Sequence, residues 1–255
     1  MSESKHYTPV AEQFSGEEEV FVFPLSFAQQ RLWFLHLLDP QSSAYNMSFA
    51  LRLSGQLDIP ALERALNEIV RRHEVLRTTF DALDGEPVQL IATTQPLEVP
   101  LTDLSSLPPE QREAETQRLV VQDALQPFDF ARGPMLRASL LRLAAEEHVL
   151  SLTMHHIVSD GWSMGVLVHE FAALYTAFSN GRLSPLEELP IQYADYARWQ
   201  REWLSGEVLA EQLSYWKRRL AGAPPVLELP ADQPRPRWQG QGSEPGGARS
   251  HPYSR

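Results

Sequence analysis

Cysteine is absent from the 255 residues of this sequence. The chain therefore has no disulfide, no thiolate nucleophile and no cysteine-ligated zinc or iron–sulfur site. Long apolar runs are also absent, because no stretch approaches the roughly 18 to 20 residues that span a bilayer. Any chemistry must therefore come from other polar and titratable side chains.

Positive charge is scarce, since 22 Lys and Arg residues face 33 Asp and Glu, giving a formal net charge of -11. A negative field of this size repels phosphate backbones, and no basic stripe interrupts it, which argues against a nucleic-acid partner. The first 20 residues are polar and acidic, without the apolar segment of a secretory signal peptide. We expect a cytoplasmic protein without membrane contact.

Helical and extended periodicities alternate irregularly along the chain, and 43% of the residues are hydrophobic, which is enough for a packed core. Helices are expected from Ser26 to Asp39, from Asp58 to Val70, and at about 109–126, 163–180, 193–204 and 207–221. Strands are expected at 47–53, 73–80, 88–91, 135–143 and 148–154, with a hairpin turn at Asp84-Gly85 and a surface connection at 92–109. This order predicts an α/β (α+β layered) fold with a mixed sheet flanked by helices.

The strongest chemical signal is the segment His155-His156-Ile157-Val158-Ser159-Asp160-Gly161-Trp162-Ser163. It lies between an apolar strand and an amphipathic helix. Adjacent histidines in an extended segment point to opposite faces, so one can face a cavity while the other packs inward. Asp160-Gly161 permits a sharp turn, and Ser163 can cap the following helix. A histidine can take a proton from an attacking amine, and an ionised Asp160 can fix its orientation.

Three other roles of this segment are less favoured. Two histidines and an aspartate can ligate zinc, but neighbouring residues diverge and the usual i, i+4 histidine pair is absent. A purely structural role would suit a lone histidine better than this combination of two histidines, a glycine and a helix cap. A Ser-His-Asp triad lacks its G-x-S-x-G elbow. Acid–base chemistry on a substrate that brings both reactants is the remaining interpretation.

HHIVSDGWS resembles the HHxxxDG signature of the condensation-domain superfamily, which includes the chloramphenicol acetyltransferase-like acyltransferases. Four other segments resemble condensation domains of nonribosomal peptide synthetases in the expected order. They are SFAQQRLWFLHLLDPQSSAYN at 26–46, RHEVLRTTF at 72–80, PFDFARGPMLRASLL at 127–141 and YADYARWQREWL at 193–204. The similarity covers about residues 22–236 and is closest to the subtype that joins an L-configured donor to an L-configured acceptor.

This resemblance implies amide bond formation between two acyl thioesters carried on phosphopantetheine arms. The arms belong to donor and acceptor carrier domains, with an adenylation domain adjacent. Phosphopantetheine is thus presented by partners, and neither a directly bound cofactor nor a metal is implied. The acceptor amine attacks the donor thioester, which lengthens the peptide.

The resemblance also assigns roles to residues. His156 is the active-site residue, as a base or an electrostatic positioner. Gly161 leaves space for the thioester, and its N–H donates to the oxyanion. His155, Asp160 and Arg77 are structural at the active site. His155 is expected inside the fold, and Asp160 is expected to pair with Arg77, or else with Arg72.

The same resemblance divides the chain into four parts: a flexible leader at 1–20, an N-terminal lobe at 21–181, the opening helices of a C-terminal lobe at 182–229, and a disordered tail at 230–255. After about residue 240 the sequence no longer resembles the family. We therefore expect a condensation domain with its second lobe truncated, as a frameshift, a gene fragment or a deliberately shortened chain would produce.

Little or no condensation activity is expected from such a chain alone. The alternatives are a related HHxxxDG acyltransferase that forms an ester or amide with a free acceptor, an epimerisation domain, and a non-catalytic fragment. Trp199 and Trp203, at i and i+4 of one predicted helix, are expected to serve packing.

Overall fold

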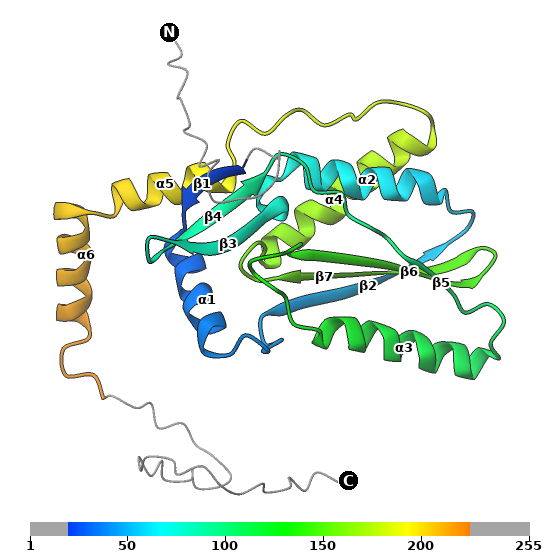
Figure 1. Ribbon diagram of the computed structural model, residues 1–255, viewed down its shortest axis with the longest axis horizontal. Coiled ribbons are helices and arrows are strands. Elements are labelled where there is room, and N and C mark those ends of the chain that lie inside the picture. Colours follow the sequence, from blue (N-terminus) through cyan, green and yellow to red (C-terminus); the bar gives the residue numbers. More distant parts are fainter. Residues whose placement is uncertain (1–19, 225–255) are drawn as a thin grey trace, which may run out of the picture. The chain divides into compact units, whose positions relative to one another are not determined.

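A computed structural model of the chain describes residues 20–224 (Figure 1). The predicted tail at 230–255, and the predicted leader at 1–20 except Val20, lie outside the described residues. Two compact units, 1–209 and 210–255, divide the chain, and the sheets and the candidate site belong to the first. Within the described part, no helix is both long and apolar enough to cross a membrane.

The strands form two sheets. The larger has the order β2 (Asn46–Ser54), β7 (Glu147–His155), β6 (Leu136–Ala144) and β5 (Leu101–Asp103). Its pairs are antiparallel except β5–β6, which is parallel, so the predicted mixed sheet is confirmed. The smaller sheet is antiparallel, with the order β1 (Val20–Pro24), β4 (Glu86–Ala92) and β3 (Thr78–Leu83). The predicted hairpin turn joins β3 to β4, with positive φ at Asp84 (52°) and Gly85 (83°).

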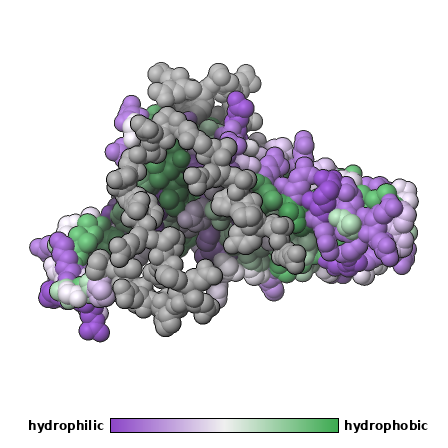
Figure 2. All heavy atoms as spheres, turned by 90° about the horizontal axis from the view of Figure 1, so that it is seen from below, coloured by the Kyte–Doolittle hydropathy of each residue, from purple (hydrophilic) through white to green (hydrophobic). Residues whose placement is uncertain are grey.

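Helices cover both faces of the larger sheet (Figure 1). On one face α2 (Ile59–Arg72) packs against α4 (Gly161–Ser179), and their apolar stripes meet alternate residues of β6 and β7, such as Leu150 and Leu152. On the other face α3 (Pro109–Leu125) packs against a smaller cluster that includes Val149. The outward side of α3 is hydrophilic (Figure 2). Both faces of the sheet are buried, because successive side chains of a strand point to opposite faces.

Three further helices complete the described chain: α1 (Phe27–Leu38), α5 (Tyr193–Trp203) and α6 (Gly206–Arg219). Helix α1 begins with the predicted capping box, in which Ser26 Oγ accepts from the Gln29 N–H and Gln29 Oε1 accepts from the Ser26 N–H.

The predicted strand at 73–80 is wrong in its first half. Glu74–Arg77 form a 3₁₀ turn, η1, and β3 begins only at Thr78. The reason is that the His73 N–H bonds to the Ile69 carbonyl and closes α2, while the Leu76 N–H bonds back to the His73 carbonyl. Backbone groups used in this tight turn cannot pair in a sheet.

The predicted connection at 92–109 contains an unpredicted strand, β5. It is three residues long with exposed side chains, so it carries no alternation signal. The two tryptophans of α5 also differ from expectation. Trp199 and Trp203 are 53% and 50% exposed and stack on each other, with ring centroids 5.5 Å apart, instead of packing into the core.

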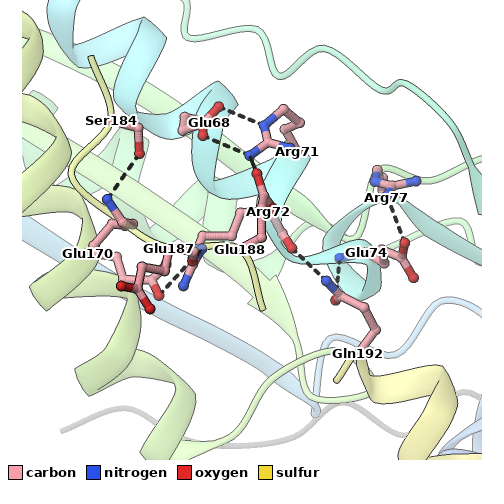
Figure 3. A network of polar contacts seen from close by, with 11 residues as sticks. Glu68, Arg71, Arg72, Glu74, Arg77, Glu170, Ser184, Glu187, Glu188 and Gln192 are labelled. Atoms are coloured by element: carbon pink, nitrogen blue, oxygen red, sulfur yellow. Dashed lines mark hydrogen bonds and ion pairs between the residues drawn. The ribbon is translucent and has the colours of Figure 1, made fainter. Parts of the chain in front are cut away.

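A buried ion pair connects α2 with α4 (Figure 3). Arg72 is 8% exposed and Glu170 is 6% exposed, and Arg72 Nε lies 3.1 Å from Glu170 Oε1. The guanidinium also donates to the Glu187 carbonyl, and the Arg72 carbonyl accepts from Gln192 Nε2 at 2.9 Å. Gln192 Oε1 in turn accepts from the Glu74 N–H. This network therefore fixes the connection between α4 and α5 against the end of α2.

We predict that Glu170→Leu lowers the free energy of unfolding by about 3–5 kcal/mol, because it leaves the buried Arg72 charge uncompensated. The double variant Arg72→Met/Glu170→Leu should recover much of the loss. Urea unfolding followed by circular dichroism measures both. Arg118→Met, which breaks the exposed pair with Glu115, is the control and should have little effect. An equal decrease in the free energy of unfolding in Glu170→Leu and in the control would contradict the prediction.

Candidate active site

The two histidines of the motif lie where β7 passes into a turn, and α4 begins five residues after the second of them. His155 is the last residue of β7 and is 5% exposed, whereas His156 is exposed. The alternation along an extended segment thus separates the two side chains, as the sequence predicted. The His156 N–H bonds to the Tyr45 carbonyl at 2.9 Å and anchors the start of the turn.

The His156 ring has a defined orientation and tautomer. Its Nδ1 lies 2.7 Å from the Ser159 carbonyl oxygen. A carbonyl oxygen only accepts, so Nδ1 must carry the hydrogen. In the neutral ring Nε2 is then unprotonated, and the ring lines a cavity. His156 can therefore act as a base at Nε2.

His155 is held inside the fold as a neutral ring. Its Nδ1 accepts from the Ile157 N–H at 3.0 Å, and its ring makes an edge-to-face contact with Phe130, with ring centroids 4.7 Å apart. Burial, with smaller contributions from the charges of His36 and His156, lowers the pKa of His155 to about 4. It positions the turn and is not available as a base toward the cavity.

Asp160 caps α4, and the predicted ion pair with Arg77 is wrong. The Asp160 carboxylate accepts from the Ser163 N–H at 2.8 Å and from the Ser163 hydroxyl at 2.7 Å. These hydrogen bonds lower the pKa of Asp160. Within residues 20–224, Asp160 forms no ion pair. Ser163 is the third helical residue of the capping box, not the cap that the sequence suggested.

Both candidate arginines have other partners. Arg77 lies 3.2 Å from Glu74 Oε1 and donates to the Ala92 carbonyl. Arg72 pairs with Glu170. Asp160 needs no arginine because donors from its own helix already satisfy its carboxylate.

Gly161 is the first residue of α4 and is exposed. A Cβ placed there would meet no protein atom within 4 Å, and its φ is not in the left-handed region. Neither packing nor backbone conformation therefore requires glycine at this position. The role in leaving space for a substrate stays a prediction.

The cavity beside His156 has a volume of about 760 Å³, and aliphatic side chains from α1, η1, the histidine turn, α4 and the α4–α5 connection make up about half of its lining. Its titratable side chains are Arg31, Tyr45, His73, His156, Asp160 and Tyr193. Sequence reasoning missed His73 and Tyr193. Tyr193 lies 2.9 Å from Ser26 Oγ, and burial raises its pKa.

A buried pair of glutamines, Gln29 and Gln89, supports the turn that follows the two histidines. Gln29 is 1% exposed, and its Nε2 donates to Gln89 Oε1 at 2.9 Å and to the Ile157 carbonyl at 3.4 Å. Gln89 is also 1% exposed and donates to the Pro24 carbonyl. The capping box revealed Gln29, but nothing in the sequence showed that its amide reaches the histidine motif. Among the described residues, no group of three or more His, Asp or Glu side chains is arranged to hold a metal ion.

This combination of layered fold, strand–turn–helix motif and cavity-facing histidine is that of a condensation domain. The family model for the condensation domain matches residues 21–243. The chain belongs to this family.

Two relatives of known name are synthases. The chain is 53% identical over 216 residues to a linear gramicidin synthase of Brevibacillus parabrevis, and 56% identical over 215 residues to chondramide synthase cmdD of Chondromyces crocatus. These alignments cover 85% and 84% of this chain, but only 4% and 6% of the relatives. The chain thus spans a small part of the length of these relatives.

Solved structures confirm the predicted fold class. An X-domain structure from teicoplanin biosynthesis, in complex with OxyB, matches with a TM-score of 0.73 at 35% identity over 88% of this chain and 48% of the other. The first condensation domain of the CDA synthetase matches with a TM-score of 0.70 at 25% identity, over 80% of this chain and 51% of the other. The chain therefore spans about half the length of these structures.

We predict that stability falls as the pH drops from about 6.5 to about 4, in part because His155 is buried neutral. The unfolded state takes up a proton on His155 below its ordinary pKa of 6.5, while the folded state resists until about 4. The unfolded state then binds more protons, so acid favours it, by about 3 kcal/mol at the low end of this window. Urea unfolding at a series of pH values measures the slope.

His155→Asn is the matched control, because its amide oxygen can accept from the Ile157 N–H but does not titrate. The difference in stability between the unaltered chain and this variant should shrink as the pH falls. A constant difference across the window would show that His155 is not responsible.

Proposed function

We propose that this chain contributes the histidine-bearing part of a site that forms an amide from an amine and a thioester. The main observation behind this proposal is the His156 tautomer: the Ser159 carbonyl accepts from Nδ1–H, so Nε2 is the acceptor of the neutral ring, and His156 lines the cavity. Membership of the condensation-domain family supports this assignment.

The proposed reaction has two steps. The amine nitrogen attacks the thioester carbonyl carbon, and a C–N bond forms as His156 Nε2 accepts a proton from the nitrogen or holds the charged intermediate. The C–S bond then breaks, and the proton ends on the departing thiol. Gly161 leaves room for the thioester, and its N–H at the start of α4 stabilises the oxyanion. His155 and Asp160 hold the turn, and Arg77 holds the adjoining η1 turn.

Donor and acceptor carrier domains are the proposed partners, each presenting its substrate on a phosphopantetheine arm, with an adenylation domain adjacent and no directly bound cofactor. The synthetase names of the relatives support this assignment. The proposed setting is a cytoplasmic assembly line for secondary metabolites.

We propose further that the chain alone has little or no activity. It spans about half the length of solved condensation-domain structures. The cavity rim is also open to solvent, since Trp162 is 84% exposed and Ile191 is 66% exposed. Water would weaken each electrostatic interaction on which the reaction depends.

The direct test joins this chain to the second half of a condensation domain from chondramide synthase cmdD and supplies carrier-bound aminoacyl thioesters. We expect amide product by mass spectrometry from the fusion, little or none from the chain alone, and loss of product in His156→Ala. Product from the chain alone would refute the need for the second half. Product only with free alcohols or free amines would instead assign the related acyltransferase activity.

Gly161→Ala tests the proposed clearance in the same fusion. The added methyl group meets no protein atom within 4 Å, so the unfolding midpoint should not change. Activity should fall by about 100-fold, because a displacement of about 1 Å at the reacting carbonyl costs that much. Gly165→Ala is the matched control, since it is an exposed α4 glycine with equally open surroundings. Equal activity of the two variants would contradict the role of Gly161.

A further inference from the structure

A second imidazole lies in the cavity with His156. His73 is the C-terminal cap of α2, and its side chain lines the cavity wall. Its Nε2 lies 2.7 Å from Glu170 Oε2. Glu170 pairs with Arg72 through its other oxygen, so its Oε2 serves as the acceptor in the contact with His73. The hydrogen of this contact therefore belongs to His73 Nε2.

The opposite ring nitrogen of His73 is open. Within residues 20–224, Nδ1 of His73 has no hydrogen-bond partner. The fully enclosed side-chain nitrogen and oxygen atoms without a partner in this part of the chain belong to Asn46, Arg77, Gln95, Arg112, His148 and Ser151. His73 Nδ1 is not one of them, and His73 itself lines the cavity.

The two cavity histidines are therefore held in opposite tautomers. His156 carries its hydrogen on Nδ1 and offers Nε2, whereas neutral His73 carries it on Nε2 and offers Nδ1. In each case the tautomer is set by the hydrogen bond of the other nitrogen, as is general for histidine. The cavity lining thus includes two imidazoles on different elements, each of which keeps one acceptor nitrogen when the ring is neutral.

We propose that His73 is a second substrate-binding residue, whose Nδ1 accepts a hydrogen bond from a substrate N–H group. This inference rests on the proposed function, in which the substrates bring two kinds of N–H: the attacking amine and the amides of the pantetheine arm. A purely structural contact with Glu170 would not require an open nitrogen at the cavity wall, and Arg72 already anchors Glu170 to α2.

The tautomers are tested directly by long-range ¹H–¹⁵N spectra of the full chain labelled at histidine, recorded over a series of pH values so that the neutral rings are observed. The variants His73→Gln and His156→Ala assign the signals. We expect Nε2–H for His73 and Nδ1–H for His156. An Nδ1–H tautomer of His73 would overturn the proposal before any ligand is added.

Two probes distinguish the source of the N–H group. Pantetheine has amides and no amine, and an amino acid methyl ester has an amine and no amide. We expect at least one of them to shift the His73 Nδ1 signal. A shift of His156 without a shift of His73 would overturn this inference and leave the proposed function standing. If neither histidine responds, the inference is rejected, and the fusion assay alone decides on the proposed function.

Affinity gives a second measure. Gln at position 73 can still donate to Glu170 but lacks the open ring nitrogen, so His73→Gln should weaken binding of the effective probe about fivefold with an unchanged unfolding midpoint. His169→Gln, at an exposed α4 position outside the cavity lining, is the matched control and should bind normally. Unchanged affinity in His73→Gln would overturn the proposal.

Discussion

The buried ion pair between Arg72 and Glu170 is the constraint on which the site's arrangement depends. Neither charge can remain in an apolar interior without the other, so α2 and α4 must meet where the pair forms. Arg72 also donates to the Glu187 carbonyl in the connection to α5, and the second oxygen of Glu170 contacts His73. One pair thus brings together the helix that follows the histidine motif, the cavity wall opposite it, and the segment that leads to Tyr193.

Much of this fold could be predicted from the sequence because its signals are local. The capping box at Ser26, the Asp84-Gly85 hairpin and the alternation that separates His155 from His156 each depend on a few neighbouring residues. Two features that the sequence did not show depend on partners distant in sequence. Glu170 lies 98 positions from Arg72, and no periodicity shows that a glutamate on an apolar helix will meet an arginine on another. Strand β5 exists only through its pairing with β6.

The motif around Asp160 was identified from the sequence, but the ion pair with Arg77 that was predicted for it is wrong. The sequence showed an aspartate that needs a partner, and the arginines of the second block were reasonable candidates. The backbone offered a nearer solution, because the first turn of α4 presents an N–H and a hydroxyl from Ser163 at hydrogen-bond distance. A carboxylate at a helix N-terminus is also stabilised by the helix dipole. The charge is therefore satisfied within four residues, and both arginines are used elsewhere in the fold.

The chemistry of His156 depends on the shape of the turn more than on any neighbouring side chain. The acceptor that fixes its tautomer is the Ser159 backbone carbonyl, so a residue of any type at 159 could supply it. That carbonyl faces the ring only if the chain reverses between the strand and the helix. The reversal is held by His155 on the Ile157 N–H, by Gln29 on the Ile157 carbonyl, and by the Asp160 cap. In the proposed reaction these polar residues act through the backbone, so replacing any of them would disturb the His156 ring even though none of them needs to touch the substrate.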